Sequence, residues 1–475
     1  MVTTLKAKKS SKTQPVWLCI AALLFIVSYI CPNPSGLEAQ GTKILFLLVI
    51  SLIFMFTEAL PGGMIGLLMF VLQPVMGIQP LSGALYPFTM TSCWFLFVSF
   101  SLSAVIGQTS IPTRILVFML KVFGTKSKSL ILGIMAGTAF ISMFISNLPA
   151  TAIPMGFALI LIKAMPEGES KQRMAKALMI GIPFAAMMGG CGTPAGSTTN
   201  VIAMNLAEIY TSVTINFGQW MCVGVPVAII GTLLCWLVVV FVYKPPEIDK
   251  EIVDDFMNQA ADQGPMTWAD KLLLMVFGLM FVLWVLGTWV KALDTTVVAI
   301  LGLCLLAMPK YGVTSMDTIF KNTPWSAWLM GQGIGAAALV VNTSGTIAWL
   351  MENYVPALPS GTGVVLFLLV VGLVLAALHI PIPIGPSLIG LTIGPLLIMA
   401  EQLGGGLNPM YIVMALTFFC AFNMVLPLDS VPILTYGQGY YTFGDYFKGG
   451  IPATILMTIV VAVWIPIILP ILNFV

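Results

Sequence analysis

The chain has 475 residues, of which 59% are hydrophobic and only 8% are charged. A soluble domain carries about 25% charged residues, and a soluble fold of this size could not bury so much apolar surface. The net charge of +2 comes without a basic patch that interleaves aromatic residues, so we expect no nucleic-acid partner. The composition predicts an all-α polytopic membrane protein.

Apolar runs recur along the chain. A transmembrane helix needs roughly 20 mostly apolar residues, and we predict about eleven spans. Lys6, Lys8, Lys9 and Lys12 precede the first run, which favours a cytoplasmic N-terminus. That run is long and lacks a small-residue cleavage site, so we expect an anchor in the cell membrane, the inner membrane in a bacterium. The runs are 15–32, 41–57, 63–78, 128–145, 218–243, 269–290, 295–308, 362–378, 408–425 and 450–473.

Several catalytic and metal-binding signatures are missing from the sequence. The eight cysteines are scattered and form no C-x-x-C pair, so we predict neither a zinc site nor a disulfide framework. No Walker-type phosphate loop occurs, which argues against a nucleotide-driven pump. His379 is the only histidine, and no Gly-x-Ser-x-Gly motif accompanies it. We therefore do not expect a membrane-embedded protease or acyltransferase, or any other enzyme.

A polar linker divides the chain near its middle. Residues 244–270 are rich in proline and acidic residues and separate an N-terminal repeat, 1–243, from a C-terminal repeat, 271–475. Landmarks recur in both parts at an offset of 232 to 234 residues, which indicates two inverted repeats. The paired landmarks are Ser92-Cys93-Trp94 with Ser326-Ala327-Trp328, Gln108-Thr109-Ser110 with Asn342-Thr343-Ser344, Pro149 and Pro154 with Pro381 and Pro386, and Pro194 and Ser197 with Pro427 and Ser430.

Each repeat holds two segments in which proline or glycine interrupts an apolar run. These segments are 146–154 and 189–200 in the first repeat, and 379–387 and 423–432 in the second. Proline cannot donate a backbone hydrogen bond and breaks a helix. Within lipid, freed backbone groups are tolerated only where they line a cavity or are buried in protein. Paired broken helices indicate the central site of a secondary transporter, whereas a channel would more readily repeat one filter-forming loop.

Three stretches resemble the signatures of a known family. Residues 56–61, Phe-Thr-Glu-Ala-Leu-Pro, look like its third-helix signature. Ser142 with Ser146 and Asn147 is similar to its first Ser-x-x-x-Ser-Asn-Thr motif, and 193–200 resemble its Thr-Pro-x-Gly-x-x-x-Asn loop. In this order, the stretches resemble the divalent anion–sodium symporter family, which carries di- and tricarboxylates or sulfate. The resemblance covers almost the whole chain.

The resemblance implies a homodimer in which each protomer has a scaffold domain and a transport domain that moves as an elevator. It also implies two re-entrant hairpins, at about 84–109 and 318–343. The scaffold helices would lie at about 15–78 and 271–309, and the transport parts at about 84–210 and 318–440.

The same motifs imply the site residues. The chain offers no intramembrane arginine to bind a dianion, so helix N-termini, backbone amides, hydroxyls and the Asn carboxamide must supply the donors. A sodium ion needs oxygen ligands, and those implied are Ser142, Ser146, Asn147 and Gly196. The implied substrate contacts are Asn147, Leu148, Thr193, Pro194, Ser197 and Thr198 in the first repeat, and His379, Ile380, Ser387, Pro427 and Ser430 in the second.

The chain departs from the family pattern, mostly in the second repeat. Leu148 stands where the family has a Thr, and Leu378-His379-Ile380 stands where a Ser-Asn-Thr would. Asp429 stands opposite Gly196. The second sodium site therefore loses side-chain ligands, and we expect one retained sodium site.

Two ionisable residues fall at these altered positions, and such residues inside a membrane are expensive and usually functional. His379 either contacts an ion or substrate, or is a neutral histidine bonded to a backbone carbonyl. Asp429 either caps a loop or substitutes for the lost sodium site. Both are candidates for a role in coupling.

We predict a secondary active transporter that moves small di- or tricarboxylate-type anions, coupled to a cation through one sodium site. The alternative is a sodium-independent carrier, proton-coupled or exchanging, of organic anions or of an inorganic oxyanion such as sulfate. The expected partners are the small anion, the lipid bilayer and a second copy of the chain.

Overall fold

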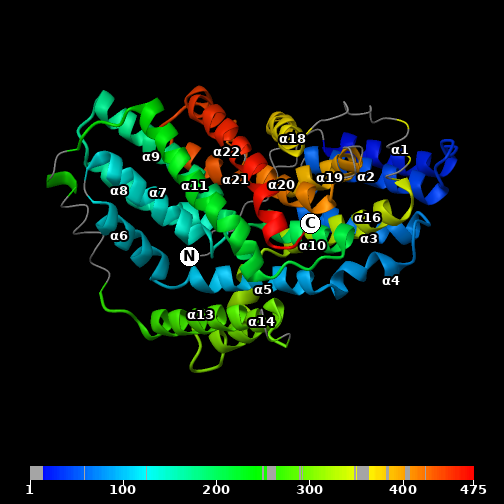
Figure 1. Ribbon diagram of the computed structural model, residues 1–475, viewed down its shortest axis with the longest axis horizontal. Helices are drawn as coiled ribbons and strands as arrows, with labels where there is room; N and C mark the ends of the chain where they lie inside the picture. Colours follow the sequence, from blue (N-terminus) through cyan, green and yellow to red (C-terminus); the bar gives the residue numbers. More distant parts are fainter. Residues whose placement is uncertain are drawn as a thin grey trace.

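In the computed structural model, every regular element of the described residues is a helix (Figure 1), which confirms the all-α prediction. The structure describes residues 14–474 except 58, 125, 249–250, 254–263, 288–289, 291, 347–348, 350–352, 354–362, 381–384, 402–406 and 423. The first half holds α1 (Gln14–Ile30), α2 (Ala39–Thr57), α3 (Gly62–Val75), α4 (Leu81–Ala84), η1 (Tyr86–Thr89), α5 (Thr91–Ile106), α6 (Ile111–Phe123), α7 (Ser127–Ser142), α8 (Asn147–Ala164), α9 (Glu169–Gly190), η2 (Pro194–Gly196), α10 (Thr198–Thr211) and α11 (Phe217–Tyr243). The second half holds α13 (Trp268–Leu286), α14 (Thr295–Leu306), α15 (Met316–Asn322), α16 (Trp325–Thr343), α18 (Val364–Leu378), α19 (Gly385–Glu401), α20 (Pro409–Ala421), α21 (Ser430–Tyr436) and α22 (Phe443–Ile471).

Many of the apolar helices are shorter than a full membrane span. Among the described residues, α8, α11 and α22 are individually long and apolar enough to cross a bilayer, and α5 with α6 pass the same test as a pair bent by 71°. The 14 residues of α3 extend only about 21 Å, against a hydrocarbon core of roughly 30 Å. Helices of that length begin or end within the thickness of the bilayer, so breaks between consecutive helices lie inside the membrane.

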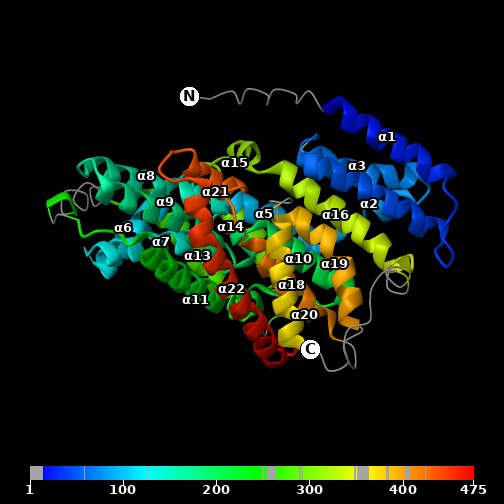
Figure 2. The same ribbon diagram turned by 90° about the horizontal axis from the view of Figure 1, so that it is seen from above.

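The helices pack into two groups, joined by α10 and α19. One group contains α1, α2, α3, α5, α13, α14 and α16, and the other contains α6 to α9, α11, α18 and α20 to α22. Figures 1 and 2 place α1, α2, α3 and α16 at one end of the molecule and α6 to α9 at the other. Both α10 and α19 pack against α20 in the second group and against α16 in the first. These two helices therefore bridge the groups.

Contacts between the two halves of the chain are reciprocal. Helix α3 packs against α16, and α14 packs against α5. In the same way α10 packs against α20 while α21 packs against α9, and α8 packs against α21 while α19 packs against α10. The sequence landmarks equate α5 with α16, α8 with α19 and α10 with α21. Such exchanged pairing is what two structurally similar halves, related by a pseudo-two-fold axis, would produce.

The predicted hairpins at 84–109 and 318–343 are not hairpins in the structure. Each segment ends in one long helix, α5 or α16, and both of these helices belong to the group of α3 and α14. The helix–break–helix pairs are instead α7–α8 and α18–α19. The Trp landmarks lie within α5 and α16, where the indole of Trp328 donates to the Cys93 carbonyl at 3.0 Å. Helices α11 and α22 pack with the broken helices, and the division into scaffold and transport parts stays a prediction.

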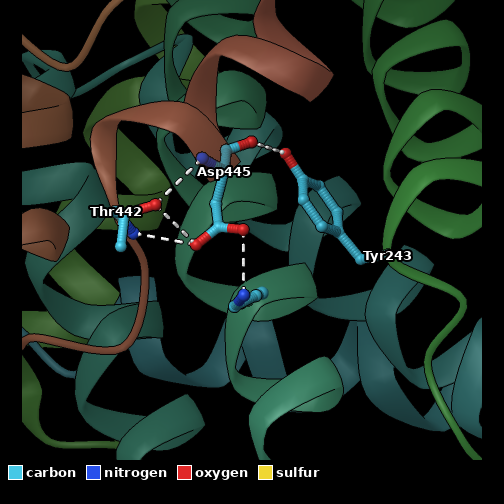
Figure 3. Close-up of polar contacts among 4 residues, drawn as sticks. Tyr243, Thr442 and Asp445 are labelled. Carbon is cyan, nitrogen blue, oxygen red and sulfur yellow. Dashed lines mark hydrogen bonds and ion pairs between the residues drawn. The ribbon is translucent and has the colours of Figure 1, made fainter.

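A cluster of polar contacts links α9, α11 and α22 at one end of these helices (Figure 3). Lys176 forms an ion pair of 2.9 Å with Asp445, and the Tyr243 hydroxyl donates to the Asp445 carbonyl at 2.8 Å. Thr442 and Asp445 form a capping box that satisfies the first amides of α22. Asp445 is therefore a helix cap and an interhelical link.

Helices α3 and α16 approach so closely that two positions admit only glycine. A Cβ on Gly66 would lie 2.3 Å from the Leu329 carbonyl oxygen, and one on Gly333 would lie 2.6 Å from the Gly66 carbonyl oxygen. Close backbone approach at small residues is how helices associate in lipid, where apolar burial supplies little driving force.

Gly66→Leu is expected to lower the thermal unfolding temperature of the detergent-solubilised protein, because the side chain must separate α3 from α16. Overpacking of this kind typically destabilises by about 1–3 kcal/mol. Gly278→Leu on α13 is the matched control, since a Cβ there meets no atom within 4 Å. Equal unfolding temperatures for the two variants would contradict the close-contact interpretation.

Candidate functional site

All four interrupted segments contribute to the wall of one cavity of about 240 Å³. Its walls come from the starts of α8, α10 and α19, from the end of α20, from the loop before α21 and from α16. The lining residues are Ser146, Asn147, Leu148, Ser197, Thr198, Thr199, Ala327, Met330, Gly385, Pro386, Cys420, Ala421, Asp429 and Val431.

Three helices point their N-terminal ends at this cavity. Asn147 is the first residue of α8, Ser197 is the N-cap of α10, and Gly385 is the first residue of α19. Free amides at a helix N-terminus and the helix dipole both favour an anion. These helix starts favour an anion, whereas the one charged side chain in the described lining is the carboxylate of Asp429.

The Asn147 carboxamide lies at the centre of a tight polar cluster behind the cavity wall. In one orientation its Oδ1 accepts from Ser142 Oγ at 2.8 Å, and Ser142 Oγ also lies 2.8 Å from the Ala186 carbonyl oxygen. In the turned orientation its Nδ2 donates to Ser142 Oγ at 2.8 Å, and to the carbonyl oxygens of Gly196 and Ala186 at 3.1 Å. In the turned orientation the Asn147 nitrogen donates hydrogen bonds to all three neighbouring oxygen atoms. In the other orientation the Asn147 oxygen faces the same three oxygen atoms.

This donor set fits a sodium ion. With Oδ1 turned inward, the amide oxygen faces only other oxygen atoms, those of Ser142, Ala186 and Gly196. The turned amide satisfies this cluster by hydrogen bonds alone, and with Oδ1 inward the same oxygen atoms are the type of ligand that a hard cation takes. Three of the four predicted sodium ligands, Ser142, Asn147 and Gly196, thus lie together. The fourth, Ser146, lines the cavity beside them, and its amide donates to Ser103 Oγ at 2.9 Å.

Asn200 holds the loop that carries Gly196. Its buried Nδ2 donates to the carbonyl oxygens of Gly190 at 2.7 Å and Thr193 at 2.8 Å. The Thr193 hydroxyl in turn donates to the Met143 carbonyl in the break between α7 and α8. These bonds tie the two interrupted segments of the first half to each other. Thr193 and Pro194 consequently lie in the packed layer behind the cavity, not on its wall.

The second half places its altered residues differently. His379 is the C-cap of α18, is 1% exposed and is not among the cavity-lining residues. Its ring interacts with the backbone of Leu375 and Cys420, and its Nε2 has no hydrogen-bond partner. His379 thus contacts the end of α20 in the second half, as Asn147 contacts α9 in the first.

The other residues predicted for the second half differ in whether they line the cavity. Asp429, the N-cap of α21, lines the cavity, whereas Ile380 and Pro427 do not. The side chains of Ser387 and Ser430 lie outside the described residues. In the first half Leu148, Ser197 and Thr198 line the cavity as expected from the motif. The sequence reasoning missed the lining residues Thr199, Ala327, Met330, Gly385, Pro386, Cys420, Ala421 and Val431.

A second cavity lies further along the contact between α16 and α19. It has a volume of about 200 Å³ and is lined mostly by aliphatic side chains such as Ile334 and Ile393. It lacks the convergent donors that an anion needs, so the polar cavity is the candidate site.

Comparison with known proteins relates the chain to one family of membrane transporters. Residues 12–473 match the family described as the sodium:sulfate symporter transmembrane region. The sodium-dependent dicarboxylate transporter SdcS of Staphylococcus saprophyticus is 26% identical over 379 residues, which are 73% of this chain and 72% of that protein. SdcS of Staphylococcus aureus is 27% identical over 383 residues, covering 73% and 71%. A membrane protein of Cupriavidus necator is 23% identical over 465 residues, covering 93% and 89%.

Two solved transporters share the fold. The YdaH transporter of Alcanivorax borkumensis superposes with a TM-score of 0.54 at 13% identity, over 96% of this chain and 99% of that one. MtrF of Neisseria gonorrhoeae, from a class of antimetabolite efflux pumps, gives 0.55 at 12% identity, over 97% and 95%. At these identities the likeness concerns the fold alone, and it supports a polytopic transporter architecture.

Gly190→Ala is expected to weaken sodium binding by about 10- to 100-fold, the usual effect of disturbing residues that orient metal ligands. The added methyl would lie 2.2 Å from Asn147 Oδ1 and displace it. The measurement is the sodium-dependent rise in unfolding temperature. Gly156→Ala on α8, where a Cβ meets no atom within 4 Å, is the control. An unchanged sodium effect in Gly190→Ala would remove Asn147 from the ion site.

Proposed function

Because the chain belongs to the sodium:sulfate symporter family, we propose that it is a secondary active transporter of small carboxylate-bearing anions. Family membership confirms the resemblance to divalent anion–sodium symporters. The chain is thus a multi-pass membrane transporter and not an enzyme. The di- or tricarboxylate class predicted from the motifs is the starting hypothesis for its substrate, because the SdcS relatives carry dicarboxylates.

The convergence of three helix N-termini on the polar cavity is the main support for an anionic substrate. Hydroxyls of Ser146, Ser197 and Thr198 and the Asn147 amide stand at these helix starts. Neutral donors and helix dipoles bind a carboxylate without the permanent charge of an arginine. A carrier must also release its cargo, and such donors hold an anion less tightly than a buried ion pair would.

Coupling to sodium at the first-half site is the proposed energy source. Ser142, Ser146, Asn147 and Gly196 would hold the ion directly beside the carboxylate, so each charge favours the binding of the other. The counterparts of the first three in the second half are Val374, Leu378 and His379, which supply no side-chain oxygen. We therefore propose one sodium site. Proton coupling, anion exchange and transport of an inorganic oxyanion such as sulfate remain the alternative functions.

The proposed transport cycle is an elevator movement in a homodimer within the cell membrane. The division into two helix groups bridged by α10 and α19 supports it, because one group can move as a body against the other. In this scheme α3, α5, α14 and α16 belong to the scaffold. A cytoplasmic N-terminus, indicated by the N-terminal lysines, completes the proposed topology.

Asn147→Ala is expected to abolish uptake of labelled carboxylates into proteoliposomes under a sodium gradient, because it removes both a substrate donor and an ion ligand. Folding should be retained, which size-exclusion chromatography and thermal unfolding would check. Asn322→Ala serves as the matched control, since Asn322 is an exposed residue of α15 that bonds within its own helix. Wild-type uptake by Asn147→Ala would reject the site.

Sodium activation of uptake is expected to be hyperbolic, with a Hill coefficient near one, because only the first half retains side-chain oxygen ligands. Sigmoidal activation would show that the second half also binds sodium.

If the charge of His379 takes part in coupling, uptake by the wild type should depend on pH, since the imidazole is the one side chain among the predicted second-half contacts that can bind a proton as a base. His379→Asn should remove that dependence. Identical pH profiles for the wild type and His379→Asn would assign His379 a structural role.

A further inference from the structure

The second cavity, of about 200 Å³, lies where the two bridging helices meet the first helix group. Helices α2, α3 and α16 form one side of this apolar cavity, and α10 and α19 form the other. Both views show α19 beside α2 and α16 (Figures 1 and 2), and α19 contacts each of them. A molecule bound in the apolar cavity would therefore touch helices on both sides of a contact that changes during the proposed elevator movement.

Small residues leave the apolar cavity unfilled. Gly390 and Gly394 contribute to the wall from α19, and Ala337 and Ala338 contribute to the wall from α16. A Cβ added to Gly394 would meet no atom within 4 Å. Protein interiors hold few voids larger than a water molecule, so a space of this size between packed helices indicates room for a ligand.

Water is a poor occupant of the apolar cavity. A buried water makes about three hydrogen bonds to polar groups, and the hydroxyls in the described lining are those of Ser51, Thr346 and Tyr210. The Ser51 hydroxyl already donates to the Leu47 carbonyl at 2.8 Å, and the Thr346 hydroxyl shares a hydrogen bond of 2.6 Å with Ser344. The lining therefore favours a molecule that needs no hydrogen bonds.

The apolar cavity opens toward the lipid. Val49 on α2 is 45% exposed and Pro395 on α19 is also exposed, although both line the cavity. Val49 lies near the middle of α2, an apolar helix of 19 residues, and so at the depth of the hydrocarbon core, where lipid acyl chains surround the protein. The volume exceeds the roughly 150 Å³ of an engineered apolar cavity that accepts benzene, so several methylene groups fit.

We infer that the apolar cavity binds an acyl chain of a bilayer phospholipid, which enters between α2 and α19, and that the bound chain slows transport. The chain contacts helices on both sides of the cavity, so it stabilises the conformation in which the cavity exists and lowers the population of others. The binding of the chain is independent of the proposed function, whereas its effect on turnover rests on the proposed elevator movement. The apolar and polar cavities share no described lining residue, so the bound chain removes no contact to the carboxylate.

The first measurement locates the acyl chain in the wild-type protein. The protein is reconstituted in phosphatidylcholine vesicles in which a small share of the lipid carries a photoreactive diazirine at the middle of one acyl chain. After illumination, we expect label on Ala337, Ala338 and Ile393, which are buried and line the apolar cavity. Label on exposed residues alone would overturn the acyl-chain site.

The second measurement uses Gly394→Leu, whose side chain would occupy the apolar cavity and, unlike a lipid chain, cannot leave it. The matched control is Gly278→Leu on α13, because it makes the same change within a helix, at a position outside the cavity where a Cβ meets no atom within 4 Å. We expect Gly394→Leu to lose the label on Ala337 and Ala338. It should also lower kcat for sodium-driven uptake of succinate by about fivefold or more, the lower end of the usual coupling between two sites, with KM unchanged. Gly278→Leu should match the wild type in both measurements.

The outcomes separate lipid binding from transport. Unchanged label in folded Gly394→Leu would overturn the assignment of the acyl chain to this cavity. Loss of the label with a wild-type kcat would overturn the effect on turnover. Label on Ala337 and Ala338 in a wild-type protein that takes up no succinate under a sodium gradient would support the acyl-chain site and overturn the proposed function. The labelling of the wild type decides the site even if Gly394→Leu fails to fold.

Discussion

The backbone amides of interrupted helices determine the arrangement of the site. A hydrocarbon environment does not tolerate unpaired peptide groups, so a break in a membrane helix must be enclosed by protein. Here the breaks before α8, α10 and α19 are gathered around one cavity, and each break aims free amides at it. A break that would destabilise an isolated helix in lipid thus supplies, in the assembled fold, free amides to the wall of the candidate site.

The first-half site depends on two close approaches that only glycine permits. Gly190 lets the Asn147 amide lie against α9, and Gly196 brings its carbonyl to the same amide. Asn200 fixes the intervening loop by binding the carbonyl oxygens of Gly190 and Thr193. In the proposed function Asn147 serves both the ion and the substrate, and this sharing would couple the binding of a cation to that of a carboxylate.

The two halves of the chain have the same pattern of helix packing but differ in the polar side chains near the cavity. The shared pattern is seen in reciprocal contacts, such as α3 with α16 and α14 with α5. In the second half a histidine fills the position of the Asn amide, and Asp429 enters the cavity wall. A duplicated fold can diverge in this way because each half contributes its own residues to the cavity wall.

The sequence alone determined the all-α membrane class, the interrupted segments and the motif around Asn147, because hydropathy and proline spacing are local properties of the chain. It also identified Leu148, Ser197, Thr198 and Asp429, which the structure places on the cavity wall. Only the tertiary structure decided which helices pack together. It shows that α5 packs with α14 and α16 with α3, and that Ala327 and Met330, which the sequence reasoning missed, line the cavity.

The physical reason for the difference is that packing in lipid leaves little trace in the sequence. Apolar side chains such as Met330 look alike whether they face lipid, a neighbouring helix or a cavity, since hydropathy is the same in all three settings. His379 illustrates the same limit, because the sequence shows an intramembrane histidine but not the direction of its ring. That direction depends on where the end of α20 lies, and only the folded chain brings the Cys420 carbonyl to it.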